Sequence, residues 1–447
     1  MPEDSAKDNA EMKAKKQSSR GNLKLNEGAS ISGDKIDSLV EKAVFGTDDQ
    51  TREEYRQLTR KLASTQGIFP ASIQALYEAA GKGAYHGITV PAINIRGLTY
   101  QAARAVFRAA LKHNVGAFIF EIARSEIGYT KQRPVEYATC VLAAAMREEF
   151  QGPVFIQGDH FQVNRSKYNS EPEKEITTIM ELIREAVNAG FLNIDIDAST
   201  MVDLEKDSLE QQQEKNCQIT AEMTNFIRSF EPQGVTISVG GEIGEVGKRN
   251  STVEELRAFM SGYLALLGPN IKGISKISVQ TGTAHGGVVL PDGSIASVKL
   301  DFETLRELSK VSREKYGMGG AVQHGASTLP DEAFNLFPEV DAVEVHLATG
   351  FQNLIYDSPH FPRELLLKIN RHLAENYSDE RKAEDTEEQF LYKTRKKAWG
   401  DFKKEIWSIP EENLEKIRDM LEQRFALLFQ KLNVVDTMDL VSKYVVK

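Results

Sequence analysis

The sequence predicts an α/β fold, a parallel (β/α)8 TIM barrel with helical extensions at its N- and C-terminal ends. Short apolar runs alternate with longer segments of helical periodicity through the middle of the chain. Eight such runs can be distinguished, which is the number that closes a barrel of this kind. Several runs end in glycine, histidine or acidic residues, and the carboxyl ends of parallel strands are where such a barrel holds its active site.

The predicted strands and helices alternate in order along the chain. The strands are expected at residues 89–95, 117–122, 154–156, 191–197, 235–239, 276–280, 320–323 and 342–347. The helices between them are expected at residues 100–113, 134–150, 175–189, 207–230, 252–267, 301–316 and 330–336. A doubly wound open sheet is the alternative. It is disfavoured because no Gly-x-Gly-x-x-Gly motif opens the first of these helices.

Composition divides the chain into four segments. Residues 1–34 contain almost no large apolar side chains, which predicts a disordered arm. Residues 35–68 show amphipathic periodicity and predict an N-terminal helical extension, ahead of a barrel over residues 69–358. Residues 359–447 are highly charged and then amphipathic, which predicts a C-terminal helical extension. We expect the extensions to support a homodimer or a larger homo-oligomer.

The overall composition excludes several classes of protein. The chain has 447 residues, 41% of them hydrophobic and 27% charged, as in an ordinary globular protein. Its net charge of −10 argues against nucleic acid as a partner. No apolar run approaches the length of a membrane span, so no membrane partner is expected. The two cysteines, Cys140 and Cys217, form neither a disulfide framework nor a metal-ligand motif, which favours a cytoplasmic protein.

Three histidines and one glutamate at the ends of predicted strands are the candidates for a metal site. His160, His285 and His324 each stand close to glycines that would let a ligand approach, and Glu242 follows another strand. Each histidine taken singly is more often a structural residue, but three at strand ends favour a site. Imidazoles with a carboxylate suit Zn2+ or a similar divalent ion. Glu242 is expected as an exchangeable fourth ligand or an orienting group.

Aspartates accompany these candidates on two strands. Asp159 immediately precedes His160, so their side chains are expected to diverge, with Asp159 facing the substrate as acid and base. The alternative is that Asp159 only orients a ligand. Asp195 and Asp197 share one face of a strand. Asp197, at the strand end, is expected to line the pocket, and Asp195 to lie lower in the barrel.

Two glycine-rich turns are candidates for holding a phosphate group. Gly286 and Gly287 follow one late strand, and Gly325, Ser327 and Thr328 follow the next. Backbone N–H groups in such turns bind phosphate, and barrels tend to hold phosphate after their last strands. Either turn alone would be a weak signal, because glycine-rich strand-to-helix turns are common.

The order of these motifs resembles that of the class II, metal-dependent fructose-bisphosphate aldolases over roughly residues 70–355. Several motifs match in sequence order, and together they are specific. They are Val90-Pro-Ala-Ile-Asn94, Asp159-His160, Asp197-Ala-Ser199, Gly241-Glu242-Ile-Gly244 and the two histidine motifs Gly282-Thr-Ala-His285-Gly286 and His324-Gly325.

The resemblance implies a function and a set of roles. It implies reversible cleavage of fructose 1,6-bisphosphate to dihydroxyacetone phosphate and glyceraldehyde 3-phosphate, a lyase reaction of glycolysis and gluconeogenesis. Asp159 would be the catalytic acid and base, with His160, His285, His324 and Glu242 around Zn2+ or another divalent ion, and a monovalent cation is a further candidate. The substrate-binding residues implied are Asn94, Asp197, Gly286, Gly287, Gly325, Ser327, Thr328, His346 and Thr349.

Departures from the family pattern leave the substrate open. Gln157 stands where the family has a histidine, and His346 replaces an asparagine on the last strand. Residues 248–251 lack the family's loop acid, and residues 287–290 lack its phosphate-contacting lysine. Other features, such as Asn164 after the Asp-His pair, are similar to the large subunit of tagatose-bisphosphate aldolase. The alternatives are therefore a tagatose-bisphosphate aldolase, its non-catalytic partner subunit, or an aldolase for another sugar.

Overall fold

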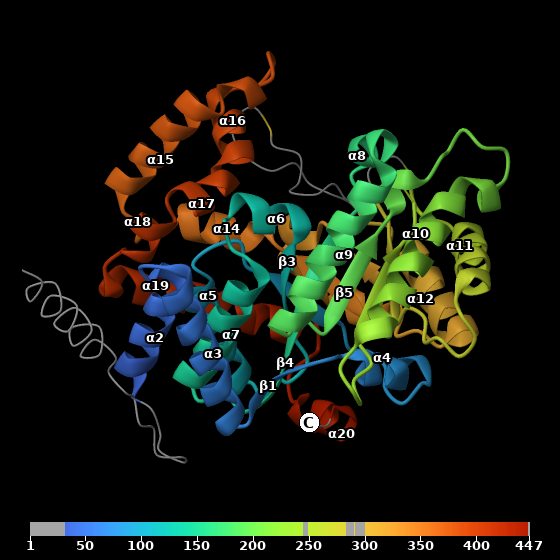
Figure 1. Cartoon of the computed structure of the whole chain (residues 1–447), viewed down its shortest axis with the longest axis horizontal. Helices are drawn as coiled ribbons and strands as arrows, with labels where there is room; N and C mark the ends of the chain where they lie inside the picture. Colours follow the sequence, from blue (N-terminus) through green and yellow to red (C-terminus); the bar gives the residue numbers. More distant parts are fainter. Residues whose placement is uncertain (1–31, 245–248, 283–289, 291–299, 446–447) are drawn as a thin grey trace, which may run out of the picture.

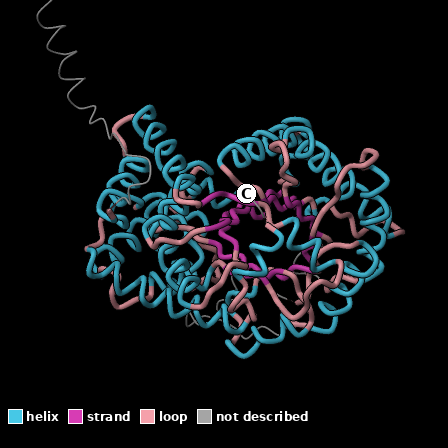
Figure 2. The backbone as a smooth tube through the Cα atoms, turned by 90° about the horizontal axis from the view of Figure 1, so that it is seen from below, coloured by secondary structure: helices cyan, strands magenta, loops and turns pink. Residues whose placement is uncertain are grey.

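The computed structural model describes residues 32–244, 249–282, 290 and 300–445 of the chain. Its centre is a closed barrel of eight parallel strands, β2 to β9, each hydrogen-bonded to the next, with β9 returning to β2. Figure 2 shows the strands as a ring enclosed by helices. The strands are β2 (Val90–Asn94), β3 (Ile119–Ala123), β4 (Gly152–Gln162), β5 (Asn193–Asp197), β6 (Ser238–Glu242), β7 (Lys276–Val279), β8 (Ala321–Gln323) and β9 (Glu344–Leu347).

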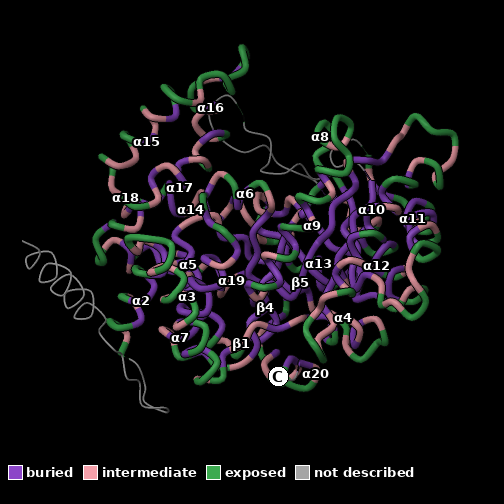
Figure 3. The backbone as a smooth tube through the Cα atoms, viewed as in Figure 1, coloured by how far each residue is buried: buried purple, intermediate pink, exposed green. Residues whose placement is uncertain are grey.

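This architecture confirms the predicted fold class, and each of the eight predicted strands overlaps an observed one. The helices that follow the strands are α5 (Thr99–Lys112), α7 (Pro134–Arg147), α9 (Pro172–Ala189), α10 (Leu209–Phe230), α11 (Val253–Leu266), α12 (Phe302–Tyr316) and α14 (Thr349–Tyr356). The helix predicted at residues 330–336 is instead a 3-10 turn, η3 (Asp331–Asn335), followed by the short α13 (Leu336–Glu339). Figure 3 shows that the strands and the helix faces towards them are buried.

Local sequence signals explain where the helices begin and end. α11 starts with a capping box, in which the Thr252 hydroxyl accepts from the Glu255 N–H and the Glu255 carboxylate accepts from the Thr252 N–H. α9 starts with Pro172 in its first turn and ends at Gly190, which has a φ of 98°. Only glycine adopts that left-handed conformation without strain, so the chain can turn directly from α9 into β5.

A ninth strand, β1 (Ile68–Ala71), lies outside the barrel and was not expected from the sequence. It pairs in parallel with the first residues of β4. The sequence analysis assigns no strand to these four residues, because a run that short shows no alternation and contains Pro70. Proline is tolerated in an edge strand, since it needs no ladder hydrogen bond on its outer side.

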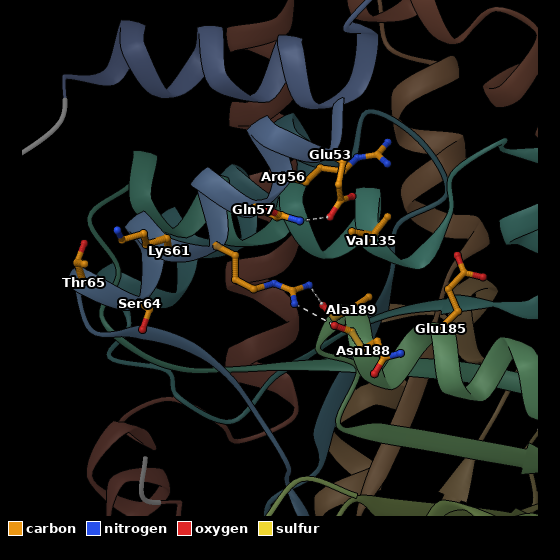
Figure 4. A pocket seen from close by; sticks show the side chains of 11 residues that line it. Glu53, Arg56, Gln57, Lys61, Ser64, Thr65, Val135, Glu185, Asn188 and Ala189 are labelled. Atoms are coloured by element: carbon orange, nitrogen blue, oxygen red, sulfur yellow. Dashed lines mark hydrogen bonds between the residues drawn. The ribbon is translucent and has the colours of Figure 1, made fainter. Parts of the chain in front are cut away.

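The N-terminal extension consists of α2 (Gly33–Phe45) and α3 (Asp49–Thr65), which pack on α7. Arg60 of α3 donates hydrogen bonds of 2.9 Å to the carbonyl oxygens of both Asn188 and Ala189, at the C-terminal end of α9. A guanidinium at this position satisfies terminal carbonyl groups and opposes the negative end of the helix dipole. Arg60 therefore joins the extension to the barrel, beside an open hollow between α3 and α9 (Figure 4).

The C-terminal extension runs from one end of the barrel to the other. Its helices are α15 (Arg363–Asn376), α16 (Glu387–Thr394), α17 (Ala398–Asp401), α18 (Lys403–Trp407), α19 (Glu411–Lys431) and α20 (Met438–Tyr444). Figure 1 shows α17 close to α14 and α20 at the opposite end, close to α4 (Gln74–Gly81). Between them, α19 packs along α5. In the part of the chain that the structure describes, no helix is long and apolar enough to cross a membrane.

Asn193, at the start of β5, joins β1, β4 and β5. Its Oδ1 accepts from the Ile73 N–H at 2.8 Å, and its Nδ2 donates to the carbonyl oxygens of Ala71 at 3.1 Å and Ile156 at 3.0 Å. The side chain is fully buried, so these backbone groups have no access to water if it is lost.

We expect Asn193→Ala to lower the free energy of unfolding by about 2–4 kcal/mol, because it leaves three buried backbone groups without partners. Urea denaturation followed by circular dichroism measures the change. Asn188→Ala, the same substitution at an exposed position of α9, is the control and should stay within about 0.5 kcal/mol of the unsubstituted protein. Equal effects of the two substitutions would contradict this role of Asn193.

Candidate active site at the barrel mouth

The Asp-His pair lies on an irregular stretch of β4. The sequence predicts that this strand ends at Ile156, but it continues to Gln162, and its pairing with β5 shifts register between Gly158 and Phe161. His160 lies inside this shift with a φ of 40°, in the left-handed region that histidine seldom occupies. A bulge of this kind redirects successive side chains. Both Asp159 and His160 consequently line the same cavity at the barrel mouth.

Three of the four predicted metal ligands come together at this mouth. His160, Glu242 and His324 each offer one ligand atom, and these atoms all lie within 4.8 Å of one another. The residues are far apart in sequence and come from β4, from β6 and from the position after β8. Glu242 and His324 are buried, and His160 is partly exposed. Two imidazoles and a carboxylate form a donor set that fits a borderline divalent ion.

Both histidines of this group have one ring nitrogen placed against a neighbouring side chain. His160 Nδ1 lies 3.0 Å from Asp197 Oδ2, and His324 Nε2 lies 2.9 Å from Ser278 Oγ. Metal-binding histidines commonly use one nitrogen for the ion and anchor the other in this way, which fixes the orientation of the ring. The arrangement therefore fits a metal ion. His285, Gly286 and Gly287, the other residues predicted in this region, lie outside the described residues.

Asp159 and His160 face different neighbours. Asp159 Oδ1 lies 3.2 Å from His346 Nδ1, whereas His160 faces Asp197 and, at 3.4 Å, Glu242 Oε2. The two side chains remain within 3.8 Å of each other, measured from Asp159 Oδ1 to His160 Nε2. A carboxylate is thus held beside the candidate metal ligands, at the cavity wall.

The cavity has a volume of about 360 Å3, which is within the range of small-molecule sites. Eight of the residues predicted from the sequence line it, and they come from the ends of four strands, β2, β4, β8 and β9. These residues are Asn94, Asp159, His160, His324, Gly325, Ser327, His346 and Thr349.

Two residues predicted to bind substrate do not line this cavity. Asp197 instead accepts hydrogen bonds from Ser199 Oγ at 2.7 Å and Gln162 Nε2 at 2.5 Å, and it faces His160. Its carboxylate is therefore engaged in orienting protein groups. Thr328 belongs to a 3-10 turn, η2 (Ala326–Thr328), in which successive side chains point about 120° apart. In this turn Ser327 lines the cavity and Thr328 does not.

Several residues that line the cavity were not singled out from the sequence. Arg96 and Glu126 follow β2 and β3, and Lys396 comes from the C-terminal extension. Nothing in the local pattern distinguishes them from ordinary surface residues. Glu121 is different, because it interrupts the apolar run of β3. A charged residue within a buried strand is costly unless it is paired, and this was a usable signal.

Comparison with known proteins places this geometry in a family. A family model described as Fructose-bisphosphate aldolase class-II matches residues 71–406, which is most of the chain and includes the whole barrel. The chain belongs to this family. Membership supports an aldolase-type enzyme, a lyase, in a family that is typically metal-dependent. A sequence search of curated proteins gives no match.

Solved structures share the fold of this class II aldolase family member at low sequence identity. The fructuronate-tagaturonate epimerase from Cohnella laeviribosi is 12% identical, with a TM-score of 0.54, over 85% of this chain and 86% of the epimerase. The fructose-bisphosphate aldolase from Campylobacter jejuni is 16% identical, with a TM-score of 0.49, over 83% of this chain and 97% of that chain. The likeness to the epimerase shows the fold alone.

Inside the barrel, a network of buried charges is centred on Lys276. Its Nζ donates to Glu344 at 2.5 Å, Gln157 at 2.7 Å and Asp195 at 2.9 Å. Glu344 Oε1 also lies 2.6 Å from His346 Nε2, so the network reaches the cavity. Gln157, which stands where the family has a histidine, is thus a structural partner of Lys276. Asp195 lies lower in the barrel, as the sequence indicated.

Burial and neighbouring charges shift the pKa values of these groups. Burial alone would lower the pKa of His160, but Asp159 and Glu242 raise it well above its usual range. Burial raises the pKa of Glu242 to about 7 and that of Glu121 to about 8, with Asp197 and Asp159 adding to the respective shifts. Because ligands must be deprotonated to bind a metal ion, we expect binding at His160 and Glu242 to release protons.

We expect Lys276→Met to lower the free energy of unfolding by about 3–5 kcal/mol, since it leaves Asp195 and Glu344 as buried charges without their counter-ion. The matched control is Lys272→Met. The Lys272 side chain is half-exposed in the loop before β7, and its substitution should cost less than about 1 kcal/mol. Combining Lys276→Met with Glu344→Gln should recover part of the loss. Urea titration measures all variants, and a cost no larger than that of Lys272→Met would contradict the network.

A second prediction concerns pH. Because the pKa of Glu121 is about 8 in the folded protein against an ordinary value of 4.5, the folded protein binds more protons than the unfolded chain between these values. Its free energy of unfolding therefore falls as pH rises through this window. We expect Glu121→Gln to gain stability relative to the unsubstituted protein from pH 5 to pH 8, by at most about 1.4 kcal/mol per pH unit.

Urea unfolding of the metal-free protein at pH 5, 6.5 and 8 measures this difference. Glu332→Gln, at an exposed position outside the barrel, is the control and should show no trend with pH. A difference between Glu121→Gln and the unsubstituted protein that stays constant with pH would show that Glu121 is ionised in the folded state throughout.

Proposed function

We propose that this protein is a zinc-dependent ketose-bisphosphate aldolase that reversibly cleaves fructose 1,6-bisphosphate to dihydroxyacetone phosphate and glyceraldehyde 3-phosphate. One observation carries the proposal. His160, Glu242 and His324 offer ligand atoms within 4.8 Å of one another, and Asp159 lines the same cavity as the two histidines. Membership in the class II family supports the reaction type.

In this proposal, His160 and His324 hold the metal ion, with His285 as the third histidine and Glu242 as the exchangeable ligand. Bound Zn2+ supplies a Lewis acid that polarises the ketose carbonyl and draws electron density from the bond that breaks. Asp197 and Ser278 keep the two described imidazoles in orientation through the contacts at 3.0 and 2.9 Å. These protein groups set the position of the site before substrate arrives.

Asp159 moves the proton. On cleavage, its carboxylate takes the proton of the C4 hydroxyl group as C4 becomes the aldehyde, and the electron pair of the C3–C4 bond passes to the other fragment, which takes up a proton at C3. Condensation reverses these steps, and Asp159 returns its proton to the C4 oxygen. His346, 3.2 Å from Asp159 Oδ1, restricts where this carboxylate can lie. No lysine is required as a covalent partner, since buried Lys276 is engaged by Glu344 and Asp195 below the cavity.

The remaining residues of the cavity would bind the sugar. Asn94, His346 and Thr349 line it on the side of β2 and β9, and Gly325 and Ser327 line it after β8. Gly325 has a φ of 69°, and the turn that it opens offers backbone N–H groups to an anion. Gly286 and Gly287 are proposed as a second turn of this kind.

One feature of the cavity favours a second candidate, an aldolase for a different ketose such as tagatose 1,6-bisphosphate. Glu121 and Glu126 line the cavity together with Asp159, so hydroxyl groups of the sugar would face three carboxyl groups. Acidic side chains select among sugars by the hydroxyl groups that they accept from, and the configuration at C4 decides whether Asp159 reaches its proton. A panel of ketose bisphosphates distinguishes the two candidates.

The first experiment is a cleavage assay of the purified chain on fructose 1,6-bisphosphate. We expect activity that EDTA removes and Zn2+ restores. Asp159→Asn should lower kcat by about 10²–10⁴-fold, the usual contribution of a general acid and base, while the metal content stays unchanged. His160→Ala and His324→Ala should lose bound zinc, as measured by elemental mass spectrometry. His372→Ala, whose ring contacts Asp401 in the C-terminal extension, is the control and should keep both zinc and activity.

The outcomes separate the alternatives. Activity on tagatose 1,6-bisphosphate and not on the fructose compound would assign the second candidate. Bound zinc without cleavage of any ketose bisphosphate would contradict an independent catalyst and favour a partner subunit. Zinc that remains after substitution of both His160 and His324 would contradict the metal site itself.

A further inference from the structure

The C-terminal extension contributes a side chain to the cavity at the barrel mouth. Lys396 lies in the 3-10 turn η5 (Arg395–Lys397), just before α17, and it lines the same cavity as Asp159 and His160. Figure 1 shows α17 at the end of the barrel where α6 (Arg124–Tyr129) and α14 lie. The extension is therefore more than a cover for the outside of the barrel.

Close packing holds this segment against the mouth. A Cβ atom at Gly97 would lie 2.0 Å from Cε3 of Trp399, and one at Gly400 would lie 2.1 Å from the carbonyl oxygen of Tyr129. Two glycines thus let α17 approach the loops after β2 and β3 more closely than any other residue would allow. Trp399 Nε1 also donates to Gln352 Oε1 of α14 at 3.1 Å. These contacts fix the turn that carries Lys396.

The neighbours of Lys396 in sequence are paired, and Lys396 itself is not. Arg395 binds Asp357, Lys397 binds Glu380 and Lys393 binds Asp385. Within the described residues, no carboxylate lies within 4.0 Å of Lys396 Nζ, which instead lies 5.8 Å from the centre of the Tyr129 ring. The one ammonium group of this segment that faces the cavity is therefore the one without a counter-ion.

Glu126, the carboxylate that acts electrostatically on Lys396, already accepts hydrogen bonds from other groups. Its Oε1 accepts from Arg96 Nε at 2.7 Å, and its Oε2 accepts from Asn94 Nδ2 at 2.7 Å and from the Ala123 N–H at 2.8 Å. Glu126 is the carboxylate that acts electrostatically on both Arg96 and Lys396, so these two cations share it. Partial burial is the larger cause of the lowered pKa of Lys396, and repulsion from Arg96 adds to it. An anion between them would relieve the repulsion between Arg96 and Lys396.

We propose that Lys396 and Arg96 form a subsite for a terminal oxyanion of the sugar substrate, a phosphate or a carboxylate. Arg96 supplies a planar guanidinium that suits such a group, and its Nη1 lies 3.3 Å from Thr349 Oγ1, which lines the same wall. Lys396 supplies a mobile point charge from the open side. The C-terminal extension is then a specificity-determining part of the active site. This inference rests on the proposed function for its substrate.

The kinetic test compares Lys396→Met with Lys404→Met in the zinc-loaded, full-length enzyme. Lys404 is exposed in α18, so its substitution makes the same charge change outside the cavity. We expect Lys396→Met to raise KM for fructose 1,6-bisphosphate about 10- to 100-fold with kcat changed less than about threefold, as for the loss of one charge-assisted contact. Lys404→Met should change neither constant more than about twofold, and Lys396→Arg should recover most of the affinity.

Fructose 1-phosphate and fructose 6-phosphate tell which end of the sugar occupies the subsite. The monophosphate that lacks the bound group should have the same KM with Lys396→Met as with the unsubstituted enzyme. Equal KM changes for Lys396→Met and Lys404→Met, or a loss confined to kcat, would overturn the subsite.

A binding measurement keeps this inference separate from the proposed reaction. Isothermal titration calorimetry with inorganic phosphate, and separately with glucuronate, needs no turnover. We expect Lys396→Met to weaken phosphate binding about tenfold relative to Lys404→Met. An effect on glucuronate alone would assign a carboxylate as the natural group. A chain that cleaves no ketose bisphosphate but shows this difference keeps the subsite, and equal affinities of the two variants for both probes overturn it.

Discussion

The ion pairs of Lys276 with Asp195 and Glu344 are the constraint on which the barrel mouth depends. They place one cation among several carboxylates in a fully buried interior, where an unpaired charge would be costly. Glu344 in turn contacts His346, and His346 contacts Asp159. The position of the Asp159 carboxylate, which we propose to be catalytic, therefore depends on the ion pairs below it. The Tyr77 hydroxyl group also donates to Glu344, so both oxygens of that carboxylate accept hydrogen bonds.

The site is assembled by closure of the barrel and by one irregular strand. Closure brings the ends of β4, β6 and β8 to a single mouth, although His160, Glu242 and His324 are separated by about 80 residues at each step. The register shift in β4 then lets adjacent residues serve different purposes. Asp159 faces His346 and His160 faces Asp197, so the acid–base role and the metal-binding role that we propose would fall to adjacent residues.

The two extensions contact different parts of the barrel. The N-terminal helices pack on α7 and are joined to α9 through Arg60, remote from the mouth. The C-terminal segment instead closes against the loops after β2 and β3, where Gly97 accommodates Trp399. It continues along α5 to the opposite end of the barrel, where Thr437 Oγ1 accepts from the N–H groups of Gly116 and Ala117. One segment therefore touches both the cavity and the base of the barrel.

The sequence by itself determined the eight barrel strands, the class of fold and about half of the residues that line the cavity at the mouth. This was possible because a buried parallel strand has the pattern of a short apolar run. In addition, the polar residues at the carboxyl ends of all the strands lie at the same end of the barrel. Asp159, His160 and His324 could be found on that basis. Glu121 and Lys276, charged residues in apolar strands, signalled that partners existed without identifying them.

Only the tertiary structure decided the partners and the boundaries. β1 is four residues long, and its pairing with β4 depends on Asn193, far away in sequence. Asp197 turned out to orient His160, because a carboxylate at a strand end can face either the cavity or a neighbouring strand. Lys396 lies in a run of basic residues that looks like a solvated surface, and its place in the cavity results from the fit of Trp399 against Gly97. Long-range packing of this kind leaves no periodic signal in the chain.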